Sequence, residues 1–570
     1  MAYFLRKFNR SRGLYLQICE SFRSPDKKNA VQKSVLVPGY VCDLQAKGIP
    51  DPVAYYSQLV KEMNDARNEI LQENKTPKIS SVSPVRHLGY FPVKAILNRL
   101  DVANPLDTFF SATRSHFSLY SMIEALVFSR LTEPCSKLKT VDEVFPALYG
   151  SYSFSYDQTL SALEFMGANY KKIIEIFTNA VMETYILDTS VGYFDCTNFY
   201  FEIDREDDFR RKGPSKENRK DPIVGMGLLL DRNCIPIGMS LYPGNQSEKP
   251  VIREVIGDLK KQNNIKGRIV QVADKGLNCS QNIITAAEAG DGYLFSKSVK
   301  QLPQKEKDWV FAEGKWTEVY DASGQLLYEY KTCIDDFEYS YRDEKTGNKK
   351  RKVKEKRVVT YNRKLARKQI REIQKMVEKA KICQLSQAKK AEYGESAKYC
   401  KFQSIDENGT LNGEKAVVEL DQEKIDQDLR LCGYNLLITS ELNLTPEEIY
   451  STYHQLSRIE ESFRCLKSQL EARPVYLQKE ERIKGHFLIC YLSVLLERLF
   501  QFKVLEKKFG SEQVYDFIRK FNVIKDSNGK WQNLSTASKL ISFLAEKYNL
   551  PIQNYYLTEK QIEKVLNRAL

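Results

Sequence analysis

The chain has 570 residues, of which 42% are hydrophobic and 11% aromatic, so wholesale disorder is excluded and about four domains are expected. No apolar run approaches the roughly 20 residues that span a membrane, and the first residues lack the apolar core of a secretory signal. The formal net charge is +13, and twelve scattered cysteines with four histidines show no spacing typical of a zinc site. We therefore expect a soluble cytoplasmic protein in which carboxylates hold any bound metal, which favours Mg²⁺.

The first 190 residues change from mixed to helical character. Strand-like pieces at 14–21 and 34–41 precede a polar helix at 51–73. From 89 to 186, apolar residues recur at three- and four-residue steps, which is typical of helices with one buried face. These patterns predict a small N-terminal arm or domain followed by a helical region.

The next hundred residues alternate between strands and helices. The predicted strands are 191–203, 223–230, 235–242, 267–273 and 292–296, and the predicted helices are 248–260 and 280–289. Three successive strands followed by alternating helices and strands predict an α/β fold with a mixed sheet.

Residues 297–430 interrupt this succession. They contain hairpin-like aromatic pieces at 309–311, 316–320 and 326–330. A strand resumes at 433–439, after which Thr445 and Glu448 form a capping box that predicts the start of a helix. We interpret 297–430 as an insertion inside one catalytic fold.

The net positive charge lies in one segment of this insertion. Residues 345–381 hold sixteen Lys or Arg and three Asp or Glu, so the rest of the chain is balanced in formal charge. The second half, from about 365 to 381, has the spacing of a helix. Such a segment can neutralise a phosphate backbone. The alternative is a solvated, lysine-rich helix that contributes only solubility.

Three acidic residues stand out by their position. Asp195 lies within an aromatic strand, where a carboxylate must be hydrogen-bonded, paired or metal-bound unless it simply faces solvent. Asp274 ends a predicted strand, a favoured ligand position in open α/β sheets, although Asp before Gly is also common in turns. Glu460 lies on a predicted helix. Together the three could hold two Mg²⁺ ions for phosphoryl transfer.

The helix that carries Glu460 places Tyr453 and Lys467 seven residues to either side of it. On a continuous helix these three side chains share one face with an apolar stripe, so we expect Glu460 to point along the core-facing side. The alternative is a boundary salt bridge between Glu460 and Lys467. Glu461 points elsewhere and is the natural control.

These stretches resemble bacterial insertion-sequence transposases of the DDE class. The matching segments are YFDCTNFYFE around Asp195, KGPSKENRKDP at 212–222, LYPGNQSEK at 241–249, VADKGLNCSQN around Asp274, YHQLSRIEESFRCLKSQLEARPVYL at 453–477 and IKGHFLICYLSVLLERL at 483–499. Within the class, the chain is similar to the branch with a Y-(2)-R-(3)-E-(6)-K signature and a β-rich insertion. The resemblance covers roughly 90–500 in order. It implies that Trp309 and Trp316 are candidates for a platform on which a flipped base stacks, the alternative being ordinary hairpin-core residues.

The resemblance implies an α/β, RNase H-like core with a mixed five-stranded sheet and a mainly helical N-terminal region. It implies that Asp195, Asp274 and Glu460 are the catalytic residues and hold two Mg²⁺ ions, for which Mn²⁺ can substitute. Tyr453 and Lys467 match the signature residues that contact DNA phosphates. Leu456 stands at the signature Arg, so Arg464, one turn beyond Glu460, is the expected guanidinium.

The implied function is a transposase that binds the terminal inverted repeats of its element, cleaves DNA and joins 3′-OH ends to target DNA. It would act as a homodimer on double-stranded DNA in a bacterial cytoplasm, in association with the nucleoid and without a membrane. The alternatives are a domesticated DNA-binding repressor and an RNase H-like nuclease without strand transfer. The expected divisions are an N-terminal arm (1–88), a helical DNA-binding region (89–190), the first part of the core (191–296), a β-rich basic insertion (297–430), the second part of the core (431–500) and a C-terminal helical segment (501–570).

Overall fold

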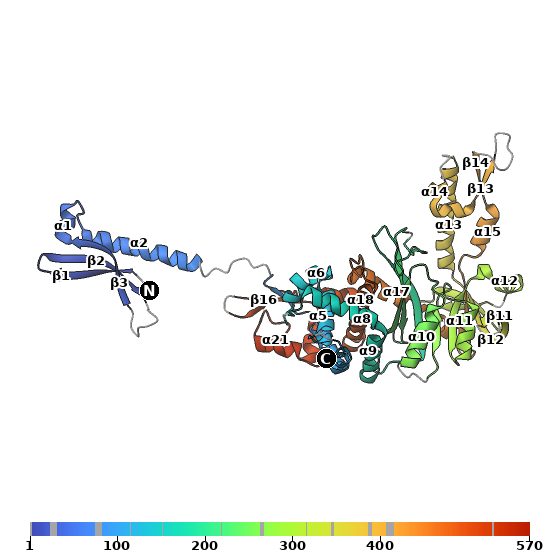
Figure 1. The fold of residues 1–570 in the computed structure, drawn as a ribbon. Helices are drawn as coiled ribbons and strands as arrows, with labels where there is room; N and C mark the ends of the chain where they lie inside the picture. The colour runs from blue at the N-terminus through green and yellow to red at the C-terminus, as the bar shows by residue number, and fades with distance from the viewer. Residues whose placement is uncertain are drawn as a thin grey trace. The chain divides into compact units, whose positions relative to one another are not determined.

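The computed structural model divides into two compact units, Met1–Ser81 and Val82–Leu570 (Figure 1). It describes residues 3–22, 31–73, 83–113, 116–150, 152–217, 219–262, 267–314, 316–343, 347–385, 390–405, 415–526 and 529–570. Within these residues no helix is both long and apolar enough to cross a membrane.

The first unit is a three-stranded antiparallel sheet with two helices. Its elements are β1 (Tyr3–Arg10), β2 (Gly13–Phe22), β3 (Val31–Tyr40), α1 (Val41–Ala46) and α2 (Pro52–Glu73). The sequence analysis found β2, β3 and α2 but missed β1. This strand pairs with β2, and two residues connect Arg10 at the end of β1 to Gly13 at the start of β2. Leu16, Ile18 and Cys19 of β2 are its buried centre.

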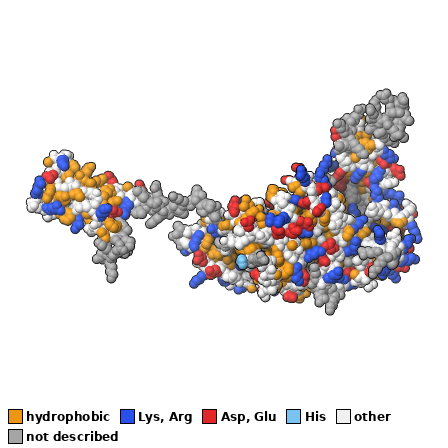
Figure 2. All heavy atoms as spheres, in the orientation of Figure 1, with side chains coloured by type: hydrophobic (Ala, Val, Ile, Leu, Met, Phe, Trp, Pro, Cys, Tyr) orange, Lys and Arg blue, Asp and Glu red, His pale blue; other side chains and the backbone are white. Residues whose placement is uncertain are grey.

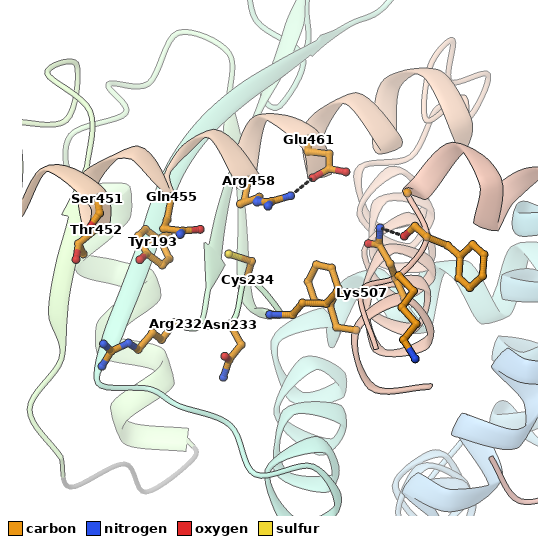
Figure 3. A pocket seen from close by; sticks show the side chains of 15 residues that line it. Tyr193, Arg232, Asn233, Cys234, Ser451, Thr452, Gln455, Arg458, Glu461 and Lys507 are labelled. Atoms are coloured by element: carbon orange, nitrogen blue, oxygen red, sulfur yellow. Dashed lines mark hydrogen bonds and ion pairs between the residues drawn. The ribbon is translucent and has the colours of Figure 1, made fainter. Parts of the chain in front are cut away.

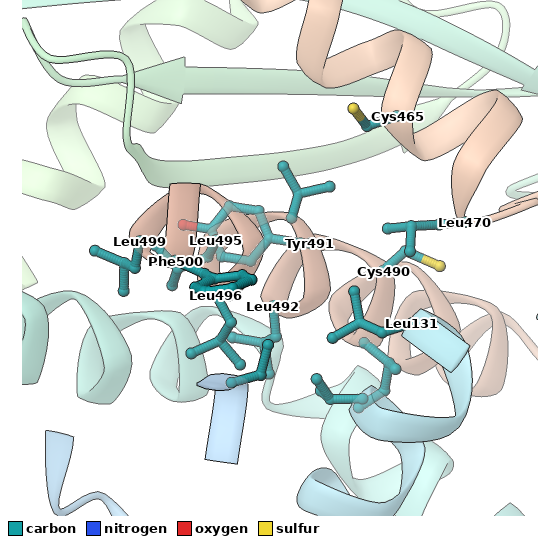
Figure 4. Packing of buried hydrophobic residues seen from close by; sticks show 14 of the residues in the cluster. Leu131, Cys465, Leu470, Cys490, Tyr491, Leu492, Leu495, Leu496, Leu499 and Phe500 are labelled. Atoms are coloured by element: carbon teal, nitrogen blue, oxygen red, sulfur yellow. The ribbon is translucent and has the colours of Figure 1, made fainter. Parts of the chain in front are cut away.

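The helical region of the second unit packs against one buried helix, α18 (Glu480–Leu499). The helices in close contact with α18 are α3 (Phe91–Leu100), α5 (Leu119–Thr132), α8 (Tyr156–Ala168) and α9 (Tyr170–Thr184), and the region also contains α4 (Ala103–Phe110), α6 (Lys137–Lys139) and α7 (Phe145–Ala147). Every residue of α18 from Gly485 to Leu499 is buried, and most of this stretch is apolar. Figure 4 shows its leucines packed within the core. The helical region and α18 therefore share one core.

A nine-stranded mixed sheet forms the centre of the second unit, in the order β10-β11-β12-β15-β9-β8-β5-β6-β7. Its strands are β5 (Val191–Tyr200), β6 (Ile223–Leu230), β7 (Pro236–Pro243), β8 (Val270–Ala273), β9 (Gly292–Lys297), β10 (Thr317–Tyr320), β11 (Leu326–Asp343), β12 (Gly347–Tyr361) and β15 (Tyr434–Thr439). β5, β8 and β9 run parallel, and the other pairs are antiparallel.

Helices cover both faces of this sheet. Successive residues of a strand point to opposite faces, so neighbouring side chains of β5 belong to two different cores. Phe194 of β5 belongs to the core formed with α10 (Val251–Gln262) and α11 (Ser280–Glu288). Tyr193 and Phe199 belong to the core that includes α17 (Ser457–Arg464) and α18. The sheet is thus the middle layer of three.

The prediction of a five-stranded sheet was wrong. Four strands, β10, β11, β12 and β15, extend it beyond β9, since the apolar end of β12 (Val358 and Val359) pairs with β15. Part of the insertion is therefore continuous with the core sheet. Its piece at 309–311 is not a hairpin strand but the end of α12 (Gln304–Phe311).

The rest of the insertion is a small helical and β subdomain. It consists of α13 (Arg363–Leu385), α14 (Lys390–Tyr393), β13 (Cys400–Ile405), β14 (Lys415–Leu420) and α15 (Gln422–Arg430). The predicted helix at 365–381 lies within α13, whose buried face packs through Ala366 and Ile373 against Tyr399 and Ile425. The exposed face of α13 keeps its basic residues.

The C-terminal segment is not purely helical as expected. Besides α19 (Ser511–Lys520), α20 (Lys539–Tyr548) and α21 (Glu559–Leu566), it contributes β16 (Asn522–Lys525), β17 (Trp531–Asn533) and β18 (Tyr556–Leu557). These strands form a four-stranded sheet with β4 (Val85–His87), in the order β18-β17-β16-β4. This pairing between residues far apart in sequence joins the C-terminal segment to the start of the second unit.

Candidate active site

Asp195 lies in the middle of β5, where its neighbours are buried and its own side chain is half-buried. It shares a strand face with Tyr193 and Phe199 and therefore points to the side that α17 and α18 cover. The backbone N–H of Cys196 donates to its Oδ1 at 2.7 Å. Burial raises the pKa of Asp195 to about 6, and the nearby Asp274 adds to this rise.

Asp274 follows the last residue of β8, directly beside Asp195. The parallel register pairs Phe194 with Ala273, so the two aspartates are the next residues along adjacent strands. The hydroxyl of Tyr453, on α16 (Pro446–His454), donates to Asp274 Oδ1 at 3.1 Å. Burial, followed by the charge of Asp274, raises the pKa of Tyr453 and keeps it a hydrogen-bond donor. The structure thus brings Asp195, Asp274 and Tyr453 together.

A lysine and a third carboxylate, neither of which the sequence analysis singled out, also belong to this cluster. Lys216 Nζ lies 4.0 Å from Asp195 Oδ1 and 3.6 Å from Glu248 Oε1, and it also donates to the backbone carbonyl of Cys196. Glu248 precedes α10 and adds to the raised pKa of Asp195. Both residues lie in stretches that carry the family resemblance, and this resemblance was the signal in the sequence that could have identified them.

Glu460 is not on the core-facing stripe that we predicted. The capping box of Thr445 and Glu448 forms as expected, but α16 ends at His454 and α17 starts at Ser457. Between them the chain tightens, with Leu456 N–H bonded to the Tyr453 carbonyl three residues back. This tightening changes the rotation between Tyr453 and Glu460, and Glu460 is exposed.

Glu460 lies in the middle of α17, whereas Lys467 lies beyond its end, in the π-helical turn Cys465–Gln469. Lys467 Nζ lies 5.6 Å from the centre of the Phe199 ring of β5 and 3.1 Å from Glu217 Oε1. Since α17 packs against β5 and Glu460 is exposed, Glu460 lies at the rim of the site rather than within it.

The donor set fits a hard divalent cation, but the structure does not gather a complete set of ligands. Asp195, Asp274 and Glu248 supply carboxylate oxygens, and their mutual repulsion is the kind that a divalent cation relieves. Among the residues that the structure describes, no three His, Cys, Asp or Glu side chains lie close enough to hold a metal ion. Neither Glu460 nor Glu248 closes the pair of aspartates into such a group.

Glu461 has a different role from Glu460. Its carboxylate pairs with Arg458 at 3.4 Å and Arg498 at 3.5 Å and accepts a hydrogen bond from Ser511 at 3.2 Å. It lines, with Arg458, a cavity of about 530 Å³ next to Lys507 (Figure 3). Neither Asp195 nor Asp274 lines that cavity.

The predicted DNA-contacting side chains lie along α17 and just beyond it. Arg464 is exposed, whereas Lys467 is half-buried in its pair with Glu217. Arg473, another residue that the sequence analysis missed, also pairs with Glu217 and lies 4.6 Å from the centre of the Tyr200 ring. Leu456, at the signature Arg position, packs against the core.

The two tryptophans of the insertion are half-buried beside a lysine. Lys331 Nζ lies 4.7 Å from the centre of the Trp316 ring and 5.7 Å from that of Trp309. Both rings contact the core formed with α10 and α11. This packing favours the ordinary core role over the stacking platform.

Comparison with known proteins agrees with this geometry. A family model described as "Transposase DDE domain" matches residues 189–496, a range that starts just before β5 and ends within α18. No curated protein matches the chain. The matched range covers more than half of the chain and contains Asp195, Asp274 and Glu460. The chain therefore belongs to the family of transposases with a DDE domain.

Proposed function

We propose that the protein is a DNA transposase that binds the terminal inverted repeats of its element, cuts the DNA by two-metal phosphoryl transfer and joins the 3′-OH ends to target DNA. The observation that carries this proposal is the pair of adjacent aspartates, Asp195 and Asp274, on parallel strands within the matched region. Burial, with a smaller contribution from the charge of Asp274, raises the pKa of Asp195, and a bound cation would stabilise this buried carboxylate.

The sheet supports an RNase H-like core. Strands β7, β6 and β5 are successive antiparallel neighbours, and β8 and β9 continue the sheet on the other side of β5 in parallel. We take these five strands as the core and β10–β12 with β15 as its extension. Asp195 then lies on the central strand and Asp274 at the end of its parallel neighbour, which is a favoured ligand position.

Asp195 and Asp274 would hold the metal, and Glu460 would join them from the rim when DNA binds. Divalent ions held there would supply Lewis-acid chemistry that activates an attacking oxygen and stabilises the leaving oxygen of a phosphodiester. Tyr453 orients Asp274 through its 3.1 Å hydrogen bond. Arg464 at the end of α17 and Lys467 in the turn beyond it would supply positive charge for DNA phosphates near the cut.

The exposed face of α13 is the second DNA-contacting surface that we propose. Arg367, Arg371, Lys375 and Lys379 recur every four residues and are all exposed. In the described part of the chain, no carboxylate forms an ion pair with any of these four. Lys and Arg side chains mark the surface around α13 in Figure 2. This stripe can neutralise several phosphates without reading bases.

Replacing Arg371 and Lys375 together by Gln should weaken DNA binding, because the variant neutralises fewer phosphates and so releases fewer counterions. The slope of log affinity against log salt should fall in magnitude by about 0.9 for each phosphate that is no longer neutralised. Fluorescence anisotropy with a labelled duplex at several salt concentrations measures this slope. The charge-conserving swap Arg371→Lys with Lys375→Arg should keep the slope, and an equal decrease in both double variants would contradict a purely phosphate-contacting role.

A repressor that no longer cuts is the second candidate, favoured by Leu456 at the signature Arg position. A labelled terminal-repeat duplex with Mg²⁺, scored for binding, nicking and joining, separates the functions. The transposase gives all three, the repressor gives binding alone, and a nuclease gives nicking without joining. We expect a homodimer in the DNA complex because two element ends must be joined.

A further inference from the structure

A cavity of about 370 Å³ in the second unit is not part of the cluster around Asp195 and Asp274. It lies between α5, the segment 135–138, the segment 471–477 and α18. The residues that matter for its chemistry are Arg130, Lys137, Tyr156, Arg473, Tyr476 and His486.

Three basic side chains of this cavity are buried together. Arg130, Lys137 and His486 are 5%, 7% and 4% exposed. Arg130 donates to the backbone carbonyls of Leu470 and Cys135 at 3.3 and 3.1 Å. His486 Nε2 lies 3.1 Å from the Ala472 carbonyl and Nδ1 lies 3.3 Å from Lys137 Nζ, so the ring is neutral, donates through Nε2 and accepts from the lysine.

This buried charge has no counter-ion among the residues that the structure describes, since none of their carboxylates lies at ion-pair distance from Arg130 or Lys137. Burying charge without a partner costs several kcal/mol. Burial, and then the charge of Arg130, lowers the pKa of Lys137 to about 7. Burial, and then the charge of Lys137, lowers the pKa of His486 well below its usual range. An anion entering the cavity would relieve this cost.

The other titratable groups around Lys137 do not supply that anion. Cys490 on α18 and Cys135 on the segment 135–138 are thiols, and burial raises the pKa of Cys490. Glu471 lines the cavity but is exposed. Arg473 adds a further positive charge at the cavity wall, although it is already paired with Glu217.

The cavity is connected to the proposed active site by a row of cations. Arg473 shares Glu217 with Lys467, and Lys467 lies over Phe199, four residues beyond Asp195 on β5. Tyr476, which is 72% exposed, and Tyr156, which is 38% exposed, line the same cavity. Exposed aromatic rings beside a phosphate site suit nucleotide stacking.

We propose that this cavity binds a backbone phosphate of the DNA strand that extends from the active site, held by Arg130 and Lys137, with Tyr156 and Tyr476 against the adjoining nucleotide. The assignment to DNA rests on the proposed function, whereas the preference for a phosphate group rests on the buried cations alone. Lys137 must be protonated to bind the phosphate. At a pH above the pKa that Lys137 has in the unbound protein, binding therefore takes up a proton.

The test is the DNA affinity of the full-length protein, without added metal, measured by anisotropy with a labelled terminal-repeat duplex between about pH 6 and about pH 9. The wild type should lose up to about tenfold in affinity per pH unit above about pH 7. Lys137→Met should bind about tenfold more weakly at low pH, lose this pH dependence and show a salt slope smaller by about one. It should fold at least as stably, because it removes a buried charge.

Lys139→Met is the matched control, since Lys139 is exposed and pairs with Glu133. It should keep the pH dependence of the wild type. Equal affinity, pH dependence and salt slope in Lys137→Met and the wild type would overturn the proposal. Thermal stabilisation of the wild type by inorganic phosphate, lost in Lys137→Met while DNA affinity is unchanged, would overturn the assignment to DNA.

The outcomes also separate this proposal from the proposed function. A wild type that fails to bind DNA at every pH contradicts the transposase itself. A wild type that binds and cuts DNA while Lys137→Met is indistinguishable from it contradicts only the phosphate site.

Discussion

Glu460→Gln should reduce DNA cleavage on the order of a thousandfold or more while leaving DNA binding nearly unchanged. Asp195→Asn and Asp274→Asn should have the same effect. The reason is that each substitution removes a charged oxygen ligand without changing the size of the side chain. Cleavage of a labelled terminal-repeat duplex with Mg²⁺ gives the rate, and anisotropy without metal gives the affinity.

Glu461→Gln is the matched control for Glu460→Gln. Glu461 is the adjacent residue, but its carboxylate pairs with Arg458 and Arg498 and accepts from Ser511. We expect this variant to cut DNA at close to the wild-type rate, with a small loss of stability from the weakened ion pairs. Substantial cleavage by Glu460→Gln would show that Glu460 stays at the rim and takes no part in the reaction.

Gly485→Ala should lower the Tm by about 3 °C or more, because overpacking a close contact costs about 1–3 kcal/mol and a unit of this size loses roughly 1 °C for each kcal/mol. A Cβ at Gly485 of α18 would overlap the backbone carbonyl of Leu163 in α8. A Cβ at Gly167 of α8 would overlap the carbonyl of Glu481 in α18. The two helices are in backbone contact at these glycines, so neither can move apart without opening the buried core around α18.

Gly257→Ala in α10 provides the control for this prediction. A Cβ there meets no atom within 4 Å, and Ala is the better helix former by about 0.5–1 kcal/mol. The variant should unfold at the same temperature as the wild type or slightly higher. Thermal unfolding followed by circular dichroism compares the two, and a Gly485→Ala protein as stable as the wild type would contradict the close packing of α8 and α18.

Local patterns predicted much of the core fold. The continuous apolar run 223–230 matches the bounds of β6, and the capping box at Thr445 marks the start of α16. The extension of the sheet was not predictable in this way, because β12 pairs with β15 and residues 362–433 separate them. β4 and β16 were missed for the same reason, since they are short and pair across more than 400 residues.

The candidate site was predictable where it depends on strands and less so where it depends on a helix. Asp195 and Asp274 lie side by side because β5 and β8 are parallel neighbours, as their positions in the sequence suggested. The interpretation of Glu460 assumed one continuous helix, and the tightening around Leu456 breaks that assumption. Lys216 and Glu248 lie in turns and loops, where no periodicity marks the direction of a side chain.

The proposed site depends most on whether Glu460 joins the two aspartates when metal and DNA are present. A crystal structure of the protein with Mn²⁺ and a terminal-repeat duplex would locate the metal by its anomalous scattering. We predict an ion between Asp195 and Asp274, with a Glu460 oxygen within about 2.3 Å of a bound ion. An ion held instead by Asp195 and Glu248, with Glu460 still in solvent, would contradict the assignment of these three residues.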